Sequence, residues 1–332
     1  MNYRSIADLH RDLIASLHLI PHDVDLIVGI PRSGLLAANM LALLLNLPLA
    51  DIEGFAEGRL LSSGVSRRRS AFDLTFENVR HVLVLDDSTY TGRALHEARL
   101  KLQHLSGRMK ITYAAVYDAD EVDIGDAVTF QRLPMPRVFQ WNLMGHSVLH
   151  RSCVDIDGVL CVDPTEAEND DGAAYVQFLL NAKRLAAPTE RMGHLVTSRL
   201  EKYRPQTEQW LAQHGVQYDN LIMLDLPSAA ERRAAGNHGR FKGEYYRSSD
   251  TILFIESEPW QAVEIARISG KDVLCTGDQQ IYRPDALSPV RLLQSVRNTN
   301  GRSLNRRLKS IVKKVLGRRS AGWLKQVRAK LS

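Results

Sequence analysis

The stretch VLVLDDSTYTG at residues 82–92 decides the fold of the first part of the chain. Its apolar run is typical of a strand buried on both faces, and the small residues after it indicate a tight turn into a helix. Asp86 and Asp87 stand at the end of the strand, where parallel sheets bind their ligands. Backbone N–H groups of residues 88–92, at the start of a helix, can bind a phosphate. The stretch therefore predicts a site for a phosphorylated sugar, with two carboxylates for its vicinal hydroxyls.

This stretch resembles the signature of the type I phosphoribosyltransferases, which use phosphoribosyl diphosphate (PRPP), although Ala94 stands where the family usually has Thr or Ser. The loop GIPRSG at residues 29–34 is a second match, and in the family it holds the diphosphate. The resemblance implies PRPP as substrate, Mg²⁺ as the bridging ion and Asp86 and Asp87 as catalytic residues. The PRPP-binding residues that it implies are Arg32, Ser33, Gly34, Asp86, Asp87, Ser88, Thr89, Tyr90, Thr91 and Gly92.

Two further segments belong to this expected site. The polar stretch at residues 57–78 stands where the family has a flexible loop that closes over the reaction and excludes water. Its candidate residues are Arg59, Arg67, Arg68 and Arg69. The second segment, residues 136–142, takes the place of the family's variable acceptor hood, and its Trp141 is expected either to stack on an acceptor or to pack between domains.

A second acidic segment, CVDIDGVL, lies at residues 153–160. Asp155 and Asp157 stand two residues apart at the end of a predicted strand, and Gly158 allows a turn that brings both carboxylates to one point. An aspartate can attack phosphorus to form an aspartyl-phosphate, and a second one can protonate the leaving oxygen and then activate water. Both are also suitable neighbours for Mg²⁺.

The string DIDGVL resembles the first motif of the haloacid dehalogenase superfamily, and its second aspartate favours phosphatase chemistry. Thr197 matches the hydroxyl of the second motif and Lys242 the lysine of the third. The strand TILFIESE at residues 251–258 matches the fourth motif, with glutamates where the family usually has aspartate. The resemblance implies Asp155, Asp157, Thr197 and Lys242 as catalytic residues. It implies metal ligands among Asp155, Asp157, Glu256 and Glu258, and leaves open which glutamate reaches the metal.

The spacing of these motifs bears on the substrate. The intervals from Asp155 to Thr197 and from Thr197 to Lys242 are 42 and 45 residues. Neither has room for a large cap domain beyond a strand and a helix, although a small helical cap at residues 164–190 stays possible. We therefore expect an open site that accepts a bulky phosphorylated group.

Apolar strands alternate with helices along all of the first 290 residues, at residues 26–30, 81–85 and 111–117 and again from residue 153 onward. This pattern predicts an α/β protein with two Rossmann-like parallel-sheet domains, 1–150 and 151–290, and a basic amphipathic helical tail at 291–332. The 332 residues include three cysteines, which do not have CxxC spacing. We find no apolar run long enough to span a membrane, and the N-terminal residues do not have the pattern of a signal peptide. A cytoplasmic location is expected.

The tail accounts for the net positive charge of the chain. Residues 297–332 hold twelve Lys or Arg and no acidic residue, which leaves 31 basic against 38 acidic residues in the rest of the chain. The body is therefore not expected to bind nucleic acid. Apolar residues at helical spacing within 303–316 suit an anionic membrane surface, RNA or an acidic partner, or a helix packed on the body.

Together the two resemblances predict a bifunctional enzyme. It would move 5-phosphoribosyl from PRPP to an acceptor and then remove the 5-phosphate, for net ribofuranosylation. A glycan or lipid-linked glycan of surface polysaccharide synthesis is the preferred acceptor, with the enzyme peripheral at the inner membrane. The alternatives are nucleobase salvage with release of a nucleoside, and a PRPP-sensing regulator. The sequence leaves the oligomeric state open.

Overall fold

The computed structural model describes residues 1–61, 74–119, 124–236 and 238–284. The chain divides into two compact units, Met1–Asp285 and Ala286–Ser332. The described part of the first unit contains a five-stranded and a six-stranded sheet, each with its own helices, and a short two-stranded sheet. The second unit, and with it the predicted basic tail, lies outside the described residues.

The first sheet has five parallel strands in the order β3-β2-β4-β5-β6. The runs predicted as strands at residues 26–30, 81–85 and 111–117 are confirmed as β2, β4 and β5, and helices follow β2 and β4 as predicted. The strands are β2 (Leu26–Gly29), β3 (Leu49–Asp51), β4 (His81–Thr89), β5 (Lys110–Asp118) and β6 (Val128–Arg132), and the helices are α1 (Ile6–Ala15), α2 (Gly34–Leu45), α3 (Ile52–Ala56) and α4 (Arg93–Leu102).

Apolar side chains cover both faces of this sheet, as the uninterrupted apolar run of β4 predicts. Leu83 and Leu85 pack in one core with residues of α1 and α2. Val82 and Val84 point to the other face, where they pack with residues of α3 and α4. In the observed register Leu85 of β4 lies opposite Gly29 of β2, so the acidic pair follows directly toward the carboxyl end of β4.

A short two-stranded sheet and two 3-10 helices lead toward the second sheet. β1 (Asn2–Arg4) pairs in parallel with β7 (Arg137–Phe139), and η5 (Gln140–Gly145) and η6 (Ser147–Arg151) follow. Leu143 and Leu149 already pack in the core of the second sheet, before the predicted boundary at residue 150. The remaining 3-10 helices are η1 (Leu17–Leu19), η3 (Phe76–Asn78), η4 (Gln103–Leu105) and η7 (Glu201–Tyr203).

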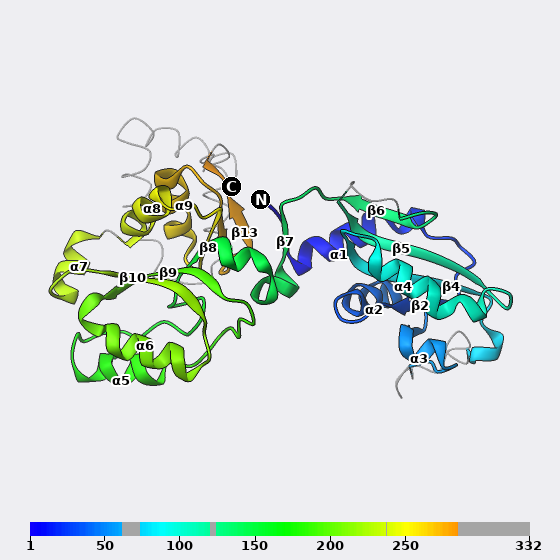
Figure 1. The fold of residues 1–332 in the computed structure, drawn as a ribbon, viewed down its shortest axis with the longest axis horizontal. Helices are drawn as coiled ribbons and strands as arrows, with labels where there is room; N and C mark the ends of the chain where they lie inside the picture. The colour runs from blue at the N-terminus through cyan, green and yellow to red at the C-terminus, as the bar shows by residue number, and fades with distance from the viewer. Residues whose placement is uncertain (62–73, 120–123, 237, 285–332) are drawn as a thin grey trace, which may run out of the picture. The chain divides into compact units, whose positions relative to one another are not determined.

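The second sheet has six strands in the order β10-β9-β8-β11-β12-β13, all parallel except the edge strand β13. Helices α5 and α6 lie on one side of it and α8 and α9 on the other (Figure 1). The strands are β8 (Ser152–Val154), β9 (Met192–Leu200), β10 (Tyr218–Leu224), β11 (Leu253–Glu256), β12 (Val273–Cys275) and β13 (Gln280–Tyr282). The helices are α5 (Ala173–Asn181), α6 (Arg204–Gln213), α7 (Ala229–Ala235), α8 (His238–Ser248) and α9 (Pro259–Ser269).

The structure refines two expectations for this half. The apolar segment at residues 153–160 is a strand only as far as Val154, and Gly158, with a φ of +76°, lies in the turn that follows. The interval at residues 164–190 contains α5, whose Tyr175, Phe178 and Leu179 are buried in the main core. This helix therefore packs as part of the domain core.

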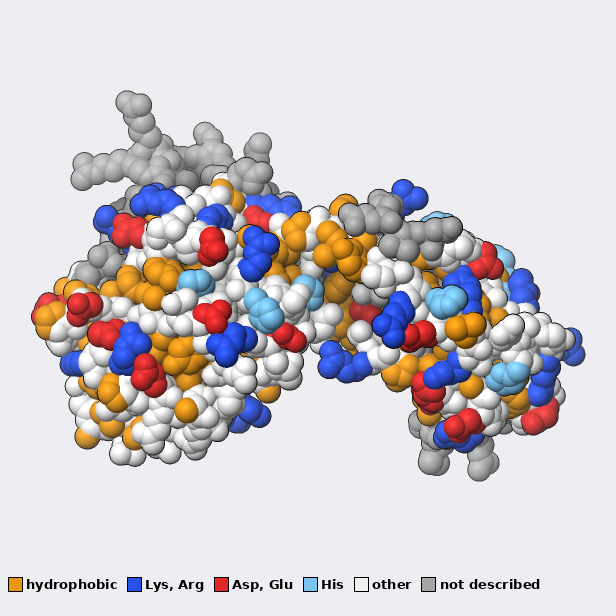
Figure 2. Space-filling model, in the orientation of Figure 1, with side chains coloured by type: hydrophobic (Ala, Val, Ile, Leu, Met, Phe, Trp, Pro, Cys, Tyr) orange, Lys and Arg blue, Asp and Glu red, His pale blue; other side chains and the backbone are white. Residues whose placement is uncertain are grey.

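Charges of both signs are interspersed over the described surface in the view of Figure 2. The three cysteines are buried and unpaired, as expected of small core residues. Among the described residues, no helix has the length and hydropathy needed to cross a membrane.

Candidate active sites

The first candidate site lies where the loop at residues 29–34 meets the end of β4. Gly29 is in register with Leu85 of β4, and Gly34 opens α2. A Cβ on Gly34 would lie 2.8 Å from Oδ1 of Asp86 and 3.0 Å from the backbone oxygen of Leu85. Only glycine permits so close an approach. The structure thus brings together the two segments that the sequence assigns to PRPP. Arg32 in this loop is exposed.

The acidic pair is almost fully buried, with Asp86 7% and Asp87 3% exposed. The Asp87 N–H donates to Oδ1 of Asp86 at 2.9 Å, and the indole N–H of Trp141 donates to Oδ2 of Asp87 at 2.7 Å. Burial, and next to it the charge of Asp87, raises the pKa of Asp86. Two adjacent buried carboxylates repel one another, so the pair is well suited to hydroxyl donors or a cation.

The turn after the pair starts later than the sequence suggests. Ser88 and Thr89 still belong to β4 and are in register with β5, so the exposed turn begins at Tyr90. Gly92 has a φ of +70°, its N–H donates to Oγ1 of Thr89 at 3.1 Å, and α4 begins at the next residue. Within the predicted phosphate segment, Tyr90 and Thr91 are exposed, Ser88 and Gly92 are half-buried and Thr89 is buried.

Of the loop candidates, Arg67, Arg68 and Arg69 lie outside the described residues. Arg59 is exposed and forms an ion pair with Glu57, with 2.6 Å between Nη2 and Oε2. The structure does not bring its side chain into contact with the acidic pair.

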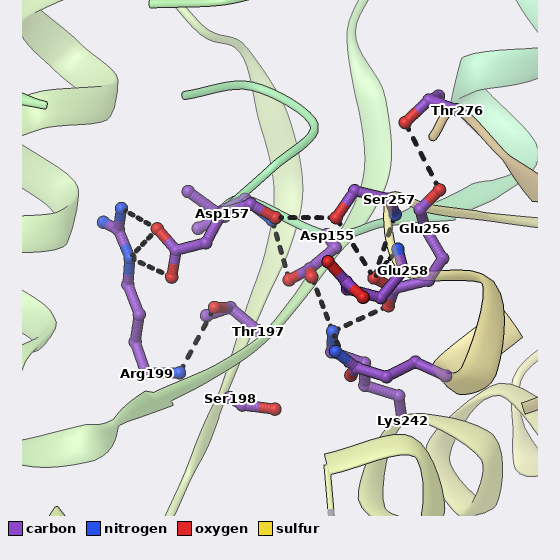
Figure 3. A network of polar contacts seen from close by, with 12 residues as sticks. Asp155, Asp157, Thr197, Ser198, Arg199, Lys242, Glu256, Ser257, Glu258 and Thr276 are labelled. Atoms are coloured by element: carbon purple, nitrogen blue, oxygen red, sulfur yellow. Dashed lines mark hydrogen bonds and ion pairs between the residues drawn. The ribbon is translucent and has the colours of Figure 1, made fainter. Parts of the chain in front are cut away.

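The second candidate site lies at the carboxyl ends of β8 and β11, which are adjacent parallel strands. Nζ of Lys242, on α8, donates to Oδ2 of Asp155 at 2.5 Å, to Oε2 of Glu256 at 2.7 Å and to Oε1 of Gln261 at 3.0 Å. Figure 3 shows the side chains of Asp155, Lys242 and Glu256 around one point. Asp155, Lys242 and Glu256 are at most 4% exposed, so their charges are stabilised mainly by one another.

The balance of charge in this cluster is negative. Burial raises the pKa of Asp155, against the opposing effect of Lys242, and the two carboxylates raise the pKa of Lys242 in spite of its burial. Two carboxylates share one ammonium group, and hard oxygen donors of this kind suit Mg²⁺. The donor chemistry therefore fits the expected ion, although no group of three possible ligands is arranged for a metal among the described residues.

The two glutamates of the fourth motif differ in their surroundings. Glu256 is fully buried, and its Oε1 accepts the N–H groups of Ser257 and Glu258 at 2.9 and 3.1 Å. Glu258 is exposed and precedes α9 as its N-cap residue. Glu256 is thus the glutamate that belongs to the Asp155–Lys242 network.

Asp157 forms its ion pair with Arg199, whereas Asp155 is paired with Lys242. Its carboxylate contacts the guanidinium of Arg199, with 2.6 Å between Oδ1 and Nη2. Thr197 is fully buried on β9, and its Oγ1 accepts the Arg199 N–H at 3.2 Å. The sequence predicted that the carboxylates of Asp155 and Asp157 meet at one point, whereas in the structure they contact different cations. The sequence analysis did not single out Arg199. The signal was present, because residues two apart on a strand share a face and Thr197 was already a candidate.

Asp163 is a further carboxyl group that sequence reasoning missed. A Cβ on Gly158 would lie 3.0 Å from its Oδ2. Burial, and next the charge of Asp157, raises the pKa of Asp163 to about 6. The group therefore borders the acidic cluster at the turn that follows β8.

Residues 2–119 match the family model described as "Phosphoribosyl transferase domain". The protein therefore carries a phosphoribosyltransferase domain, and this class of domain supports PRPP as a substrate. No curated protein matches the chain.

Among solved structures, the chain is similar to the Helicobacter pylori xanthine-guanine-hypoxanthine phosphoribosyltransferase, with 15% identity over 43% of this chain and 92% of that one and a TM-score of 0.32. The purine phosphoribosyltransferase from Pyrococcus horikoshii is 19% identical over 42% and 92% of the two chains, with a TM-score of 0.30. A chain of the Pnkp1/Rnl/Hen1 complex is 14% identical over 75% and 94%, with a TM-score of 0.27.

Proposed function

We propose that the protein is a bifunctional enzyme that transfers 5-phosphoribosyl from PRPP to an acceptor and then hydrolyses the 5-phosphate. The sum is net ribofuranosylation, which the hydrolytic step makes irreversible. The observation that carries the second activity is the buried Lys242 between Asp155 and Glu256, because such a cluster can bind a phosphoryl group beside a carboxylate nucleophile. The first activity rests on the domain match and on the contact of Gly34 with Asp86.

In the first site, the carboxylates of Asp86 and Asp87 would accept hydrogen bonds from the ribose hydroxyls of PRPP. The loop that contains Arg32 would hold the diphosphate and stabilise its charge as it leaves. Bound Mg²⁺ would neutralise the diphosphate. The acceptor then attacks the anomeric carbon while the bond to the diphosphate oxygen breaks, through a transition state with oxocarbenium character.

In the second site, an oxygen of Asp155 would attack the 5-phosphate and form an aspartyl-phosphate. Asp157 would give its proton to the leaving sugar oxygen, and would then take a proton from the water that hydrolyses the intermediate. Thr197 and Lys242 would hold the phosphoryl oxygens. Mg²⁺, held by Asp155 and Glu256, would supply positive charge opposite the phosphate.

We propose a glycan, free or lipid-linked, as the acceptor, in the synthesis of a surface polysaccharide. The order of the two reactions supports a glycan acceptor. Because transfer precedes hydrolysis, the phosphoribosylated acceptor is the substrate of the second site, and a glycan would require that site to accept a large group. The described part of the second half has only short helices between its motifs, and α5 is part of the core. The basic tail would hold the enzyme at an anionic membrane surface, where lipid-linked glycans reside.

The test is mass spectrometry of the full-length Asp155→Asn variant after incubation with Mg²⁺, PRPP and a panel of oligosaccharides, lipid-linked glycans and nucleobases. A glycan that gains one phosphoribosyl unit supports the proposal, and wild-type protein should release the 5-phosphate from that product. The double variant Asp86→Asn/Asp87→Asn is the matched control, which should lose transfer and keep phosphate release. A product without phosphate from Asp155→Asn overturns the two-step scheme.

Nucleobase transfer is the second candidate, and the position of Trp141 favours it. The half-exposed indole lies next to Asp87 and stacks on Phe139, with 4.8 Å between the ring centroids. A planar base can extend such an aromatic stack. A nucleotide product in the same experiment would support this reading, and tight PRPP binding without any product would support a regulator.

A further inference from the structure

Arg232, on α7, is buried close to the second site and has no carboxylate partner among the described residues. Its side chain belongs to a residue that is 8% exposed. Nη1 donates to the backbone oxygen of Ser198 at 3.2 Å, and Nη2 donates to Oδ1 of Asn169 at 2.9 Å. The Nε–H is buried and has no hydrogen-bond partner within the described part of the chain. Because arginine keeps its charge at physiological pH, a guanidinium without a counter-ion is costly to bury.

Three nearby cations, by contrast, each contact a carboxylate. These pairs are Lys242 with Asp155 and Glu256, Arg199 with Asp157, and Lys202 with Asp171. A phosphate ester brings up to about two further negative charges to this site at pH 7. Of these four cations, Arg232 is the one that an anion can engage without competing with a carboxylate of the protein.

Ser198 connects this guanidinium to the candidate phosphate ligands. It directly follows Thr197 on β9 (Figure 3), and its Oγ is buried without a hydrogen-bond partner in the described structure. Successive side chains of a strand point to opposite sides. Since the neighbouring Arg199 contacts Thr207 of α6, Ser198 points to the other side of the sheet, where α8 lies (Figure 1). This is the side from which Lys242 reaches Asp155.

His238 links the two cations on that side. His238 and Lys242 are four residues apart on α8 and therefore share a face of the helix. Burial, and next the positive charges of Arg232 and Lys242, lowers the pKa of the His238 imidazole. The charge of Arg232 thus acts in the same part of the site as that of Lys242.

We infer that Arg232 and Ser198 form an oxyanion subsite of the second site, which binds the phosphate group of the ester through the Nε–H of Arg232 and the hydroxyl of Ser198. This inference rests on the proposed phosphatase activity. Both groups lack an acceptor, and the phosphate oxygens would supply one to each. Because the phosphate is negatively charged in the bound ester and in the transition state alike, the subsite contributes mainly to substrate binding.

The test is steady-state kinetics of the full-length Arg232→Met variant with p-nitrophenyl phosphate and Mg²⁺, with inorganic phosphate as a competitive inhibitor. We expect KM and the inhibition constant of phosphate to rise together by about 10-fold or more, while kcat changes by less than about 3-fold. Ser198→Ala removes a neutral donor, so it should raise both constants by about 3-fold.

The matched control is Lys202→Met. Lys202 is also a cation close to this site, but its Nζ already lies 2.9 Å from Oδ1 of Asp171. Its removal should leave KM and the inhibition constant at their wild-type values. Arg232→Lys keeps the charge and loses the fixed Nε donor, so it should give constants between those of Arg232→Met and wild type. No carboxylate loses its counter-ion in Arg232→Met, and we therefore expect this variant to fold.

Wild-type values of both constants in Arg232→Met would overturn the inference, and so would a fall in kcat without a rise in KM. If that variant does not fold, Ser198→Ala decides, and an unchanged inhibition constant of phosphate then overturns the subsite. Cleavage by wild type that Asp155→Asn abolishes would sustain the phosphatase proposal whatever Arg232 does. Absence of cleavage by wild type overturns both.

Discussion

The indole N–H of Trp141 donates a 2.7 Å hydrogen bond to Oδ2 of Asp87, although the two residues are 54 positions apart in the sequence. From the sequence, Trp141 was expected either to stack on an acceptor or to pack between domains. In the structure its ring stacks on Phe139, while its polar edge holds a carboxylate of the acidic pair. The 3-10 helix η5 therefore helps to orient Asp87.

Replacing Trp141 with phenylalanine tests this role. The variant keeps an aromatic ring but loses the hydrogen bond to a charged group, which is worth about 1.5–3 kcal/mol. We expect PRPP, in the presence of Mg²⁺, to bind about 10-fold more weakly in isothermal titration calorimetry. Trp210→Phe is the control, because the indole N–H of Trp210 also donates a hydrogen bond, to the backbone oxygen of Ala182 in the second half. It should reduce stability and leave PRPP affinity unchanged. Unchanged affinity in Trp141→Phe would refute the assignment.

The close approach of Gly34 to Asp86 gives a second prediction. In Gly34→Ala the new Cβ would meet Oδ1 of Asp86 at 2.8 Å and the backbone of Leu85 at 3.0 Å, so the loop or the strand must shift. We expect a loss of about 1–3 kcal/mol in the free energy of unfolding and at least about 10-fold weaker PRPP binding. Gly107→Ala is the control, since a Cβ at that position would meet no atom within 4 Å beyond its chain neighbours. Wild-type affinity in Gly34→Ala would show that the two segments do not form one site.

The buried lysine of the second site gives a third prediction. Lys242→Met would leave Asp155 and Glu256 buried without their shared cation, which should cost about 3–5 kcal/mol in the free energy of unfolding. Urea denaturation measures the loss. On the same helix, Arg240→Met removes an exposed ion pair to Glu244 and should cost less than about 0.5 kcal/mol. Adding Asp155→Asn to Lys242→Met should restore part of the stability. The prediction fails if the lysine variant is as stable as the arginine variant.

His238 makes stability depend on pH. Burial, and next the positive charges of Arg232 and Lys242, lowers the pKa of His238 from 6.5 to about 4. Between pH 6.5 and 4 the imidazole of His238 is therefore protonated more readily in the unfolded chain than in the folded one. Protonation then favours unfolding, so the free energy of unfolding is unaffected by His238 above pH 6.5 and decreases as the pH falls toward 4. Urea denaturation at pH 7 and pH 4.5 measures the decrease in the free energy of unfolding between the two pH values. In His238→Gln this decrease should be smaller than in the wild type by about 1–2 kcal/mol, a figure that allows for the partial exposure of the imidazole.

The control for this measurement is His104→Gln, because His104 is exposed on η4. As the pH is lowered, the free energy of unfolding of this variant should decrease as steeply as that of the wild type. A wild-type pH dependence in His238→Gln would contradict the prediction.

The strands of the sheets could be predicted from local sequence patterns. Val82, Leu83, Val84 and Leu85 form an uninterrupted apolar run, which is stable only where helices cover both faces of a parallel sheet, and β4 is such a strand. Both acidic pairs were predicted at strand ends. Asp155 does follow the last residue of β8, whereas β4 continues for two residues beyond Asp87. The exact end of a strand was therefore harder to predict than its apolar centre.

Hydrophobic periodicity and short motifs were enough to predict the α/β class and the phosphoribosyltransferase domain, and to locate the acidic segments of both candidate sites. The third motif already predicted that Lys242, 87 residues from Asp155, offsets the charge of the aspartate. The pairing of Arg199 with Asp157, 42 residues away, became apparent in the folded structure. Strand order brings these two side chains together, and burial makes an unpaired charge costly.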